Sequence, residues 1–254
     1  MMHSITRVAE NKYFKAFIAA VLWLAVWQAV SFAVGSDLLI ASPVTVLKTL
    51  FEFAKKPGFW QSVALSILRI AAGFVLGTVF GVLFAVLCRG SRLAAAVLSP
   101  ALKVVRATPV VSFIILAWIW IDRGFIPVFI TLLMVLPIVW EAVYTGIGEI
   151  PVKYKELAFV FNIPFGKRLF KIYIPSVLPY FTSAAATSLG LAWKSGIAAE
   201  VICRPENTVG KYIGDFKSTL EMDSMFAMTI VVIIMSLMLE KSVGYLAAFL
   251  KRRR

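Results

Sequence analysis

Histidine and cysteine are almost missing from this sequence, which holds one histidine and two cysteines in 254 residues. His3 is the single imidazole, in an amino-terminal segment that we expect to be disordered, so neither a histidine-dependent zinc site nor a Ser-His-Asp triad can be assembled. Cys88 and Cys203 have no metal-ligand spacing, and the topology argued below places them on opposite sides of a membrane. The sequence therefore predicts no metal site, no bound cofactor and no disulfide framework.

Charged residues are also scarce. They make up 15% of the chain, against 61% hydrophobic residues, and the mean hydropathy is +0.89. This composition lies far outside the range of an ordinary soluble domain and indicates that lipid is the solvent. A transmembrane helix needs about 20 mostly apolar residues, and six uncharged runs approach that length. These runs are residues 16–34, 70–88, 107–121, 124–140, 172–193 and 224–239.

The stretches between these runs are too short to fold as soluble domains of their own. We therefore predict an all-α integral membrane protein with about six transmembrane helices, in which residues 1–254 form a single domain. Three runs are shorter than a full span, so we expect their helices to continue past charged neighbours such as Glu141, Lys194 or Glu240. The first run lacks a small-x-small cleavage site before Ser36, which favours an uncleaved first helix over a signal peptide.

The net charge of +13 would suggest a nucleic-acid partner in a soluble protein, so the distribution of this charge matters. With both termini in the cytoplasm, the cytoplasmic segments hold 17 of the 26 lysine and arginine residues, and the outer loops hold 7. This imbalance follows the positive-inside rule. Because the basic residues lie at helix ends and not on one folded surface, we expect no nucleic-acid partner.

Two segments predict how the helices lie and pack. The segment from Ser36 to Gln61 is amphipathic, and we expect it to lie along the outer membrane interface. In the second run, Gly73, Gly77 and Gly81 stack on one helical face, where small residues let two backbones approach closely. That face has two interpretations, which are tight packing within the chain and direct contact with another subunit.

A phosphate-binding loop of the G-x4-G-K-[ST] type, in which backbone amides hold the phosphates of ATP, is missing. The Gly-Lys pairs of the chain are Gly166-Lys167 and Gly210-Lys211. Phe161 and Pro205 stand where the first glycine of the motif is required. We therefore expect that the chain is not an enzyme and does not hydrolyse ATP by itself.

The loop between the fourth and fifth runs, about residues 149–175, is polar and basic in its first half, and we place it in the cytoplasm. Pro151 can start a short helix, residues 153–161 are compatible with that helix, and Asn162 can adopt the left-handed conformation that ends it. Pro164 can open a second helix. The sequence thus predicts a helix, a turn and a helix, which together form a compact element that a partner protein can grip.

This loop resembles the EAA signature in the membrane subunits of bacterial ABC importers, which has E-A-A, a glycine four residues later and a distal hydrophobic-x-P. Glu156, Leu157 and Ala158 stand at E-A-A, and Asn162 stands at the glycine. Pro175 and Pro179 take the two distal proline positions. Leu157 departs from the first alanine, and Asn162 replaces the glycine, which asparagine can do because it tolerates a positive φ.

Two of these residue types also have plainer interpretations. Taken alone, Glu156 is a solvated charge on a helix, whereas in the full motif it orients or contacts the partner. Pro175 and Pro179 are expected to shape the start of the fifth membrane helix and not to touch a substrate, because proline frees backbone groups that neighbours must satisfy.

Other stretches resemble the nitrate, sulfonate and taurine group of these importers, namely residues 41–47 (ASPVTVL), 66–74 (SILRIAAGF) and 193–201 (WKSGIAAEV). The resemblance implies a permease subunit in the bacterial inner membrane, with both termini cytoplasmic and a coupling helix that inserts into a groove on a separate ABC ATPase subunit. It also implies an extracytoplasmic substrate-binding protein, a second permease copy and membrane lipid as partners. The substrate would be a small organic or inorganic anion or a similar small solute.

Glu141 and Lys194 lie within or near membrane depth, where an ionised residue costs roughly 2.5–3.5 kcal/mol. Three interpretations are open, namely a mutual salt bridge, side chains that reach the headgroup level, and a place in the translocation path. In the last case, Lys194 would ease the passage of an anion. Arg69, near the outer end of the second run, is expected to be an interface anchor.

Two other classes of function compete with the importer. A secondary transporter driven by an ion gradient usually has internal repeats and midplane carboxylates, but we find no convincing repeat, and Glu141 is the only plausible carboxylate away from a helix end. An intramembrane enzyme would need reactive side chains in register. Ser195 adjoins Lys194, but neighbours on a helix point about 100° apart.

Overall fold

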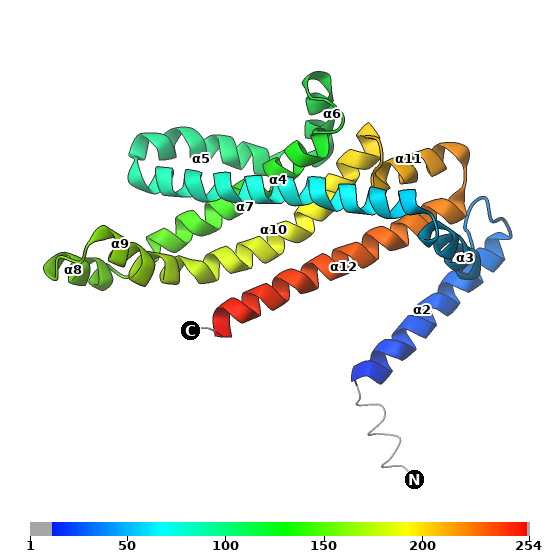
Figure 1. Cartoon of the computed structure of the whole chain (residues 1–254), viewed down its shortest axis with the longest axis horizontal. Coiled ribbons are helices and arrows are strands. Elements are labelled where there is room, and N and C mark those ends of the chain that lie inside the picture. Colours follow the sequence, from blue (N-terminus) through cyan, green and yellow to red (C-terminus); the bar gives the residue numbers. More distant parts are fainter. Residues whose placement is uncertain (1–11, 253–254) are drawn as a thin grey trace, which may run out of the picture. The chain divides into compact units, whose positions relative to one another are not determined.

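The computed structural model of the chain describes residues 12–252, so His3 lies outside the described residues (Figure 1). Every regular element among these residues is a helix, as the sequence predicted. Two compact units divide them. Residues up to Trp60 and Tyr212–Val231 form the first unit, and Gln61–Lys211 with the residues from Val232 onward form the second.

The first unit contains α2 (Lys12–Val34), α3 (Pro43–Ala54), most of α11 (Val209–Thr219) and the start of α12 (Met222–Arg252). Helix α3 begins where it does because the Ser42 hydroxyl accepts a hydrogen bond from the Thr45 backbone N–H at 3.2 Å. The Trp27 indole donates to the Ala41 carbonyl at 3.1 Å, which ties α2 to the start of α3. Ala41, Val46 and Ala227 form the buried core of this unit.

The second unit holds the remaining helices. They are α4 (Pro57–Gly90), α5 (Arg92–Ala107), α6 (Val110–Trp120), α7 (Ile126–Gly148), α8 (Val152–Val160), α9 (Phe165–Arg168), the π-helix η1 (Leu169–Tyr173) and α10 (Ile174–Cys203). Its core lies where α6, α7 and α10 meet, with Ile114, Ile130 and Ala199 fully buried. Figure 1 shows α7 and α10 running side by side, and these two helices share the most extensive contact among the helix pairs described.

Four helices are long and apolar enough to cross a membrane, namely α2, α4, α7 and α12 within their described parts. In the predicted third span, residues 107–121, α6 occupies most of the run, and it meets α5 at a bend of 107°. Pro109 causes the break, since it has no N–H to donate and disfavours helical backbone in Thr108. Counting the bent pair as one span gives five. Helix α10 has the length but carries many serine and threonine residues, so the count of six stays a prediction.

The glycine face on α4 packs within the chain. A Cβ atom at Gly73 would lie 2.5 Å from the Val128 carbonyl oxygen of α7, and one at Gly77 would lie 2.8 Å from the Val135 Cβ atom. Gly81 has the same relation to α7, one turn further along. These distances are too short for any side chain. The first interpretation of the face, close packing within the chain, is therefore confirmed.

We predict that Gly77→Ala lowers the free energy of unfolding by about 1–3 kcal/mol, because the added methyl group forces α4 away from α7. Gly90→Ala is the matched control, since a Cβ atom there meets nothing within 4 Å. The measurement is the thermal unfolding midpoint in detergent, followed by tryptophan fluorescence. Equal midpoints for the two variants would contradict the close contact.

Candidate functional site

The predicted helix, turn and helix is present in the structure as a knob formed by residues 152–168. Helix α8 follows Pro151, and Asn162 ends it with a positive φ of 45°. The Ile163 N–H donates to the Ala158 carbonyl and the Asn162 N–H to the Phe159 carbonyl, at 3.0 and 3.1 Å. This pair of bonds is a Schellman motif, which satisfies carbonyls that the helix end leaves free. Asparagine here adopts the left-handed backbone conformation that glycine usually adopts at the end of a helix.

The three residues at the E-A-A positions have different exposures. Glu156 is exposed, the Leu157 side chain is about half exposed at 48%, and Ala158 is buried at 2%. A small residue at Ala158 lets α8 pack against the rest of the knob, so Glu156 and Leu157 remain free to contact another molecule. Leu157, which replaces the alanine of the family pattern, adds an apolar side chain to the free surface.

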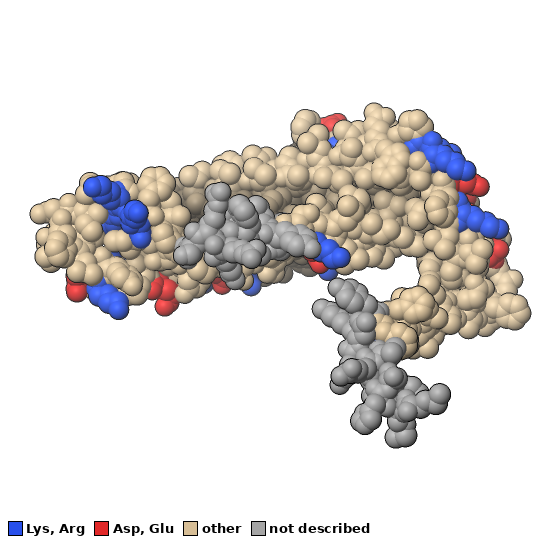
Figure 2. All heavy atoms as spheres, turned by 60° about the horizontal axis from the view of Figure 1, so that its bottom comes forward, with Lys and Arg blue, Asp and Glu red and all other residues tan. Residues whose placement is uncertain are grey.

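Large apolar side chains crowd the surface of the knob. Phe159 is 80% exposed, Val160 and Phe161 are each 71% exposed, and Phe165 is 67% exposed. Lysine and arginine side chains lie among them, and Figure 2 shows such residues gathered at the end of the molecule where α8 and α9 lie. Exposed apolar residues in one patch mark an interaction site.

The two distal prolines lie where α10 begins. Pro175 stands in the first turn of α10, and Pro179 lies one turn further in. Directly before them, residues 169–173 form a π-helix, a rare turn that often marks functional sites. The knob is thus joined to α10 through an irregular turn, as expected if the prolines shape the start of this helix.

If the knob couples transport, as the sequence resemblance implies, Asn162→Gly should preserve transport and Asn162→Val should reduce it strongly. Glycine adopts the positive φ freely, whereas the left-handed region costs other residues roughly 1–2 kcal/mol and a β-branched one more. The measurement is substrate uptake into proteoliposomes that contain the complete transporter. If Asn162→Val transports as well as Asn162→Gly, the turn geometry is irrelevant to coupling.

Glu141 forms an ion pair with Arg106 of α5, not with Lys194. Both members of this pair are more than half exposed, at 59% for Arg106 and 54% for Glu141. Lys194 is exposed on α10. The mutual salt bridge is therefore not formed in this structure, and both residues point away from the core of the chain. Arg69 donates to the Glu206 backbone carbonyl at 3.3 Å.

A buried polar network that the sequence did not reveal ties α10 to α4 and α11. Glu200 is fully buried, and its Oε2 atom accepts from the Ser66 hydroxyl at 2.7 Å and from the Gly210 N–H at 3.2 Å. The Ser66 hydroxyl accepts from the Val209 N–H at 3.0 Å. The Glu200 carboxylate and the Ser66 hydroxyl thus satisfy the first two N–H groups of α11, at a helix end where negative charge is favoured.

The close approach in this network depends on one glycine. A Cβ atom at Gly210 would lie 2.3 Å from the Glu200 Cβ atom, so only glycine fits at the start of α11. The single acidic residue in the stretch of residues 193–201, directly after the apolar residues 197–199, is the signal that could direct attention here. Sequence alone gives no partner for it, because Ser66 lies 134 residues away.

The comparison with known proteins gives one family and a consistent set of relatives. The family described as "Binding-protein-dependent transport system inner membrane component" matches residues 77–254. A "Probable ABC transporter permease protein" of Haemophilus influenzae is 30% identical over 226 residues, covering 88% of this chain and 91% of that protein. The putative aliphatic sulfonates transport permease protein SsuC of Bacillus subtilis is 26% identical, over 85% of this chain and 78% of that protein. The nitrate import permease protein NrtB of Synechococcus elongatus is 26% identical, over 81% and 78%.

Solved structures share the fold. A chain of an amino acid ABC transporter superposes with a TM-score of 0.63 at 16% identity, covering 78% of this chain and 94% of that one. A chain of a bacterial ABC transporter that imports the acidic polysaccharide alginate superposes with a TM-score of 0.64 at 13% identity, covering 97% and 98%.

Proposed function

Since the chain belongs to the family of binding-protein-dependent transport system inner membrane components, it is a permease of a bacterial ABC importer, and we propose that it couples a substrate path to a separate ATPase subunit through the knob at residues 152–168. Importers of this kind work with an ATPase and a substrate-binding protein. The exposed apolar surface of the knob, centred on Phe159, is the observation that carries the proposal. Glu156 would orient or contact the ATPase beside it.

Coupling would be mechanical, and α10 would transmit it. This helix follows the knob and continues for 30 residues, or roughly 45 Å at 1.5 Å per residue, to the region of Glu200. When ATP draws the ATPase subunits together, the knob would move and α10 would tilt. Such a tilt shifts the population between inward-open and outward-open states, because the ATPase contacts differ between them.

The proposal includes the arrangement of the whole chain in the membrane. Residues 1–254 would form one permease domain in the inner membrane, surrounded by lipid, with both termini and the knob in the cytoplasm. A second permease copy would complete the path, since Glu141 and Lys194 are exposed on the single chain. We place both residues along this path.

We propose a small anion, organic or inorganic, or a similar small solute as the substrate. Relatives named for aliphatic sulfonates, nitrate and bicarbonate support this class. An ammonium group at Lys194 would lower the cost of moving an anion past α10.

We predict that Lys194→Met slows uptake at least several-fold while the complex still assembles, and normal uptake by this variant would remove Lys194 from the path.

The decisive test of the function is uptake by proteoliposomes that contain this chain, its ATPase and its substrate-binding protein. We expect uptake that requires ATP and the binding protein and that persists when ionophores collapse the proton and sodium gradients. Uptake driven by an ion gradient without the ATPase would instead identify a secondary transporter.

A further inference from the structure

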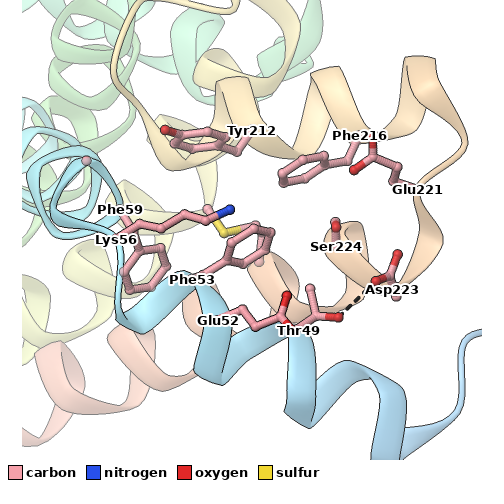
Figure 3. Close-up of a pocket in the computed structure, with 12 residues that line it drawn as sticks. Thr49, Glu52, Phe53, Lys56, Phe59, Tyr212, Phe216, Glu221, Asp223 and Ser224 are labelled. Atoms are coloured by element: carbon pink, nitrogen blue, oxygen red, sulfur yellow. Dashed lines mark hydrogen bonds between the residues drawn. The ribbon is translucent and has the colours of Figure 1, made fainter.

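The first unit contains a pocket that the transport mechanism above does not use. It lies between α3 and the segment where α11 ends and α12 begins, and it has a volume of about 480 Å³. Figure 3 shows its walls, with Phe53 and Phe59 on one side and Tyr212 and Phe216 on the other. Phe53 and Phe216 stack with their ring centroids 5.5 Å apart.

The charges in this pocket favour a cation. Glu52, Glu221 and Asp223 contribute three carboxylates, whereas Lys56 is the only basic side chain in the lining. Its ammonium group lies 5.3 Å from the centroid of the Phe53 ring, a cation–π contact. Figure 3 shows the Lys56 chain reaching between Tyr212 and Phe53. The pocket therefore already holds one ammonium group, on a flexible chain, and keeps an excess of two negative charges.

A buried hydroxyl group in the wall points to a ligand. Ser224 is only 6% exposed and lines the pocket. In the part of the chain that the structure describes, its hydroxyl has no hydrogen-bond partner. A hydroxyl that opens into a cavity and has no partner in the protein can form a hydrogen bond with a polar group that enters the cavity. The neighbouring Asp223 carboxylate is held in place by the Thr49 hydroxyl at 2.8 Å.

The faces of α3 indicate that the ligand comes from water and not from the bilayer. Val44, Leu47 and Phe51 are exposed on one face, at 57%, 49% and 68%. At about 100° per residue, Thr49 and Phe53 lie roughly 150–170° from the centre of that face, and Glu52 lies roughly 110° from it. If the apolar face rests in the outer interface, as its amphipathic pattern predicts, the pocket opens away from the acyl chains.

From this geometry we propose that the pocket formed by α3, α11 and α12 binds a lysine or arginine side chain of the importer's substrate-binding protein. The proposal rests on the proposed function, which supplies the binding protein as the partner on the outer side. A guanidinium or ammonium group would stack against Phe53 or Tyr212, displace Lys56 from the ring, pair with Glu52 or Glu221, and donate a remaining hydrogen bond to the Ser224 oxygen. The excess of carboxylates excludes an acidic side chain.

The test measures the affinity of the substrate-binding protein for the assembled transporter in nanodiscs. Glu52→Lys and Glu221→Lys are each expected to weaken binding by about tenfold, because they place a like charge against the incoming side chain. The milder Glu52→Gln should weaken it less. Asp37→Lys is the control, since Asp37 is an exposed acid of the same unit outside the pocket, and it should bind as the wild type does.

A reversed charge on the partner sharpens the test. A lysine-to-glutamate or arginine-to-glutamate change on the binding protein should restore binding to Glu52→Lys. Wild-type affinity in both lysine variants, or equal losses of affinity in the pocket variants and in Asp37→Lys, would overturn the proposal. The proposal would also be overturned if the pocket variants lost co-purifying phosphatidylethanolamine while their affinity for the substrate-binding protein stayed unchanged. In each of these outcomes wild-type uptake persists, whereas failure of the proposed function would abolish binding and uptake in the wild type itself.

Discussion

Replacing Phe159 with alanine is expected to weaken binding of the ATPase subunit by about 2–4 kcal/mol, which corresponds to roughly 30- to 1,000-fold in affinity. Phe159 is 80% exposed on the knob, beside the exposed Val160 and Phe161. An aromatic side chain at the centre of an apolar patch is the kind of residue that dominates binding energy at protein interfaces. The measurement is a titration of purified ATPase subunit against the chain in nanodiscs.

The control for this variant is Phe125→Ala. Phe125 is similarly exposed, at 68%, but lies at the start of α7 and not on the knob. It should leave the affinity unchanged within about twofold, since surface substitutions away from a contact change free energies by about 0.5 kcal/mol or less. Equal effects of the two variants would mean that the knob is not the docking surface.

Replacing Glu200 with alanine is expected to lower the free energy of unfolding by about 2–5 kcal/mol. The substitution removes the acceptor of the Ser66 hydroxyl and of the Gly210 N–H, and each buried donor left without a partner costs roughly 1–3 kcal/mol. Removing the carboxylate also removes the cost of burying it. The loss should still dominate, because alanine leaves a cavity as well as two unsatisfied donors.

The thermal unfolding midpoint in detergent measures this effect, and two further variants define its cause. Glu200→Gln keeps the volume and one acceptor oxygen, so it should lose less stability than Glu200→Ala. Glu206→Ala is the surface control, because the Glu206 side chain is 78% exposed in its ion pair with Lys211, and such pairs contribute about 1 kcal/mol or less. A smaller loss for Glu200→Ala than for Glu206→Ala would contradict the network.

Most of the local structure of the knob could be predicted from the sequence, because it follows from short-range chemistry. Pro151 and Pro164 fix where helices start, and Asn162 tolerates the positive φ that ends α8. The glycine spacing in α4 likewise predicted a closely packed face. These features depend on residues within one or two turns of each other, and the structure confirms them.

Features that depend on distant parts of the chain could not be predicted. Glu200 contacts Ser66 and Gly210 only after three helices pack together. The sequence pattern of one helix does not predict which residues of the other two it will contact. The ion pair of Glu141 with Arg106 could not be predicted either, because the two residues lie 35 positions apart on different helices and only Lys194 was considered as a partner from the sequence. The bend at Pro109 could not be predicted from hydropathy, because an uncharged run gives the length of a helix and not the direction of its axis.

The account depends most on contact between the knob and an ATPase subunit during transport. The direct measurement places a photo-crosslinking amino acid at position 157 in the assembled transporter, with position 125 as the control, and irradiates it while ATP-driven uptake is recorded. The account predicts that position 157 crosslinks to the ATPase subunit, that position 125 does not, and that Glu156→Lys reduces both the crosslink and uptake. Full ATP-driven uptake without a crosslink at position 157, together with unchanged uptake in Glu156→Lys, would contradict the account.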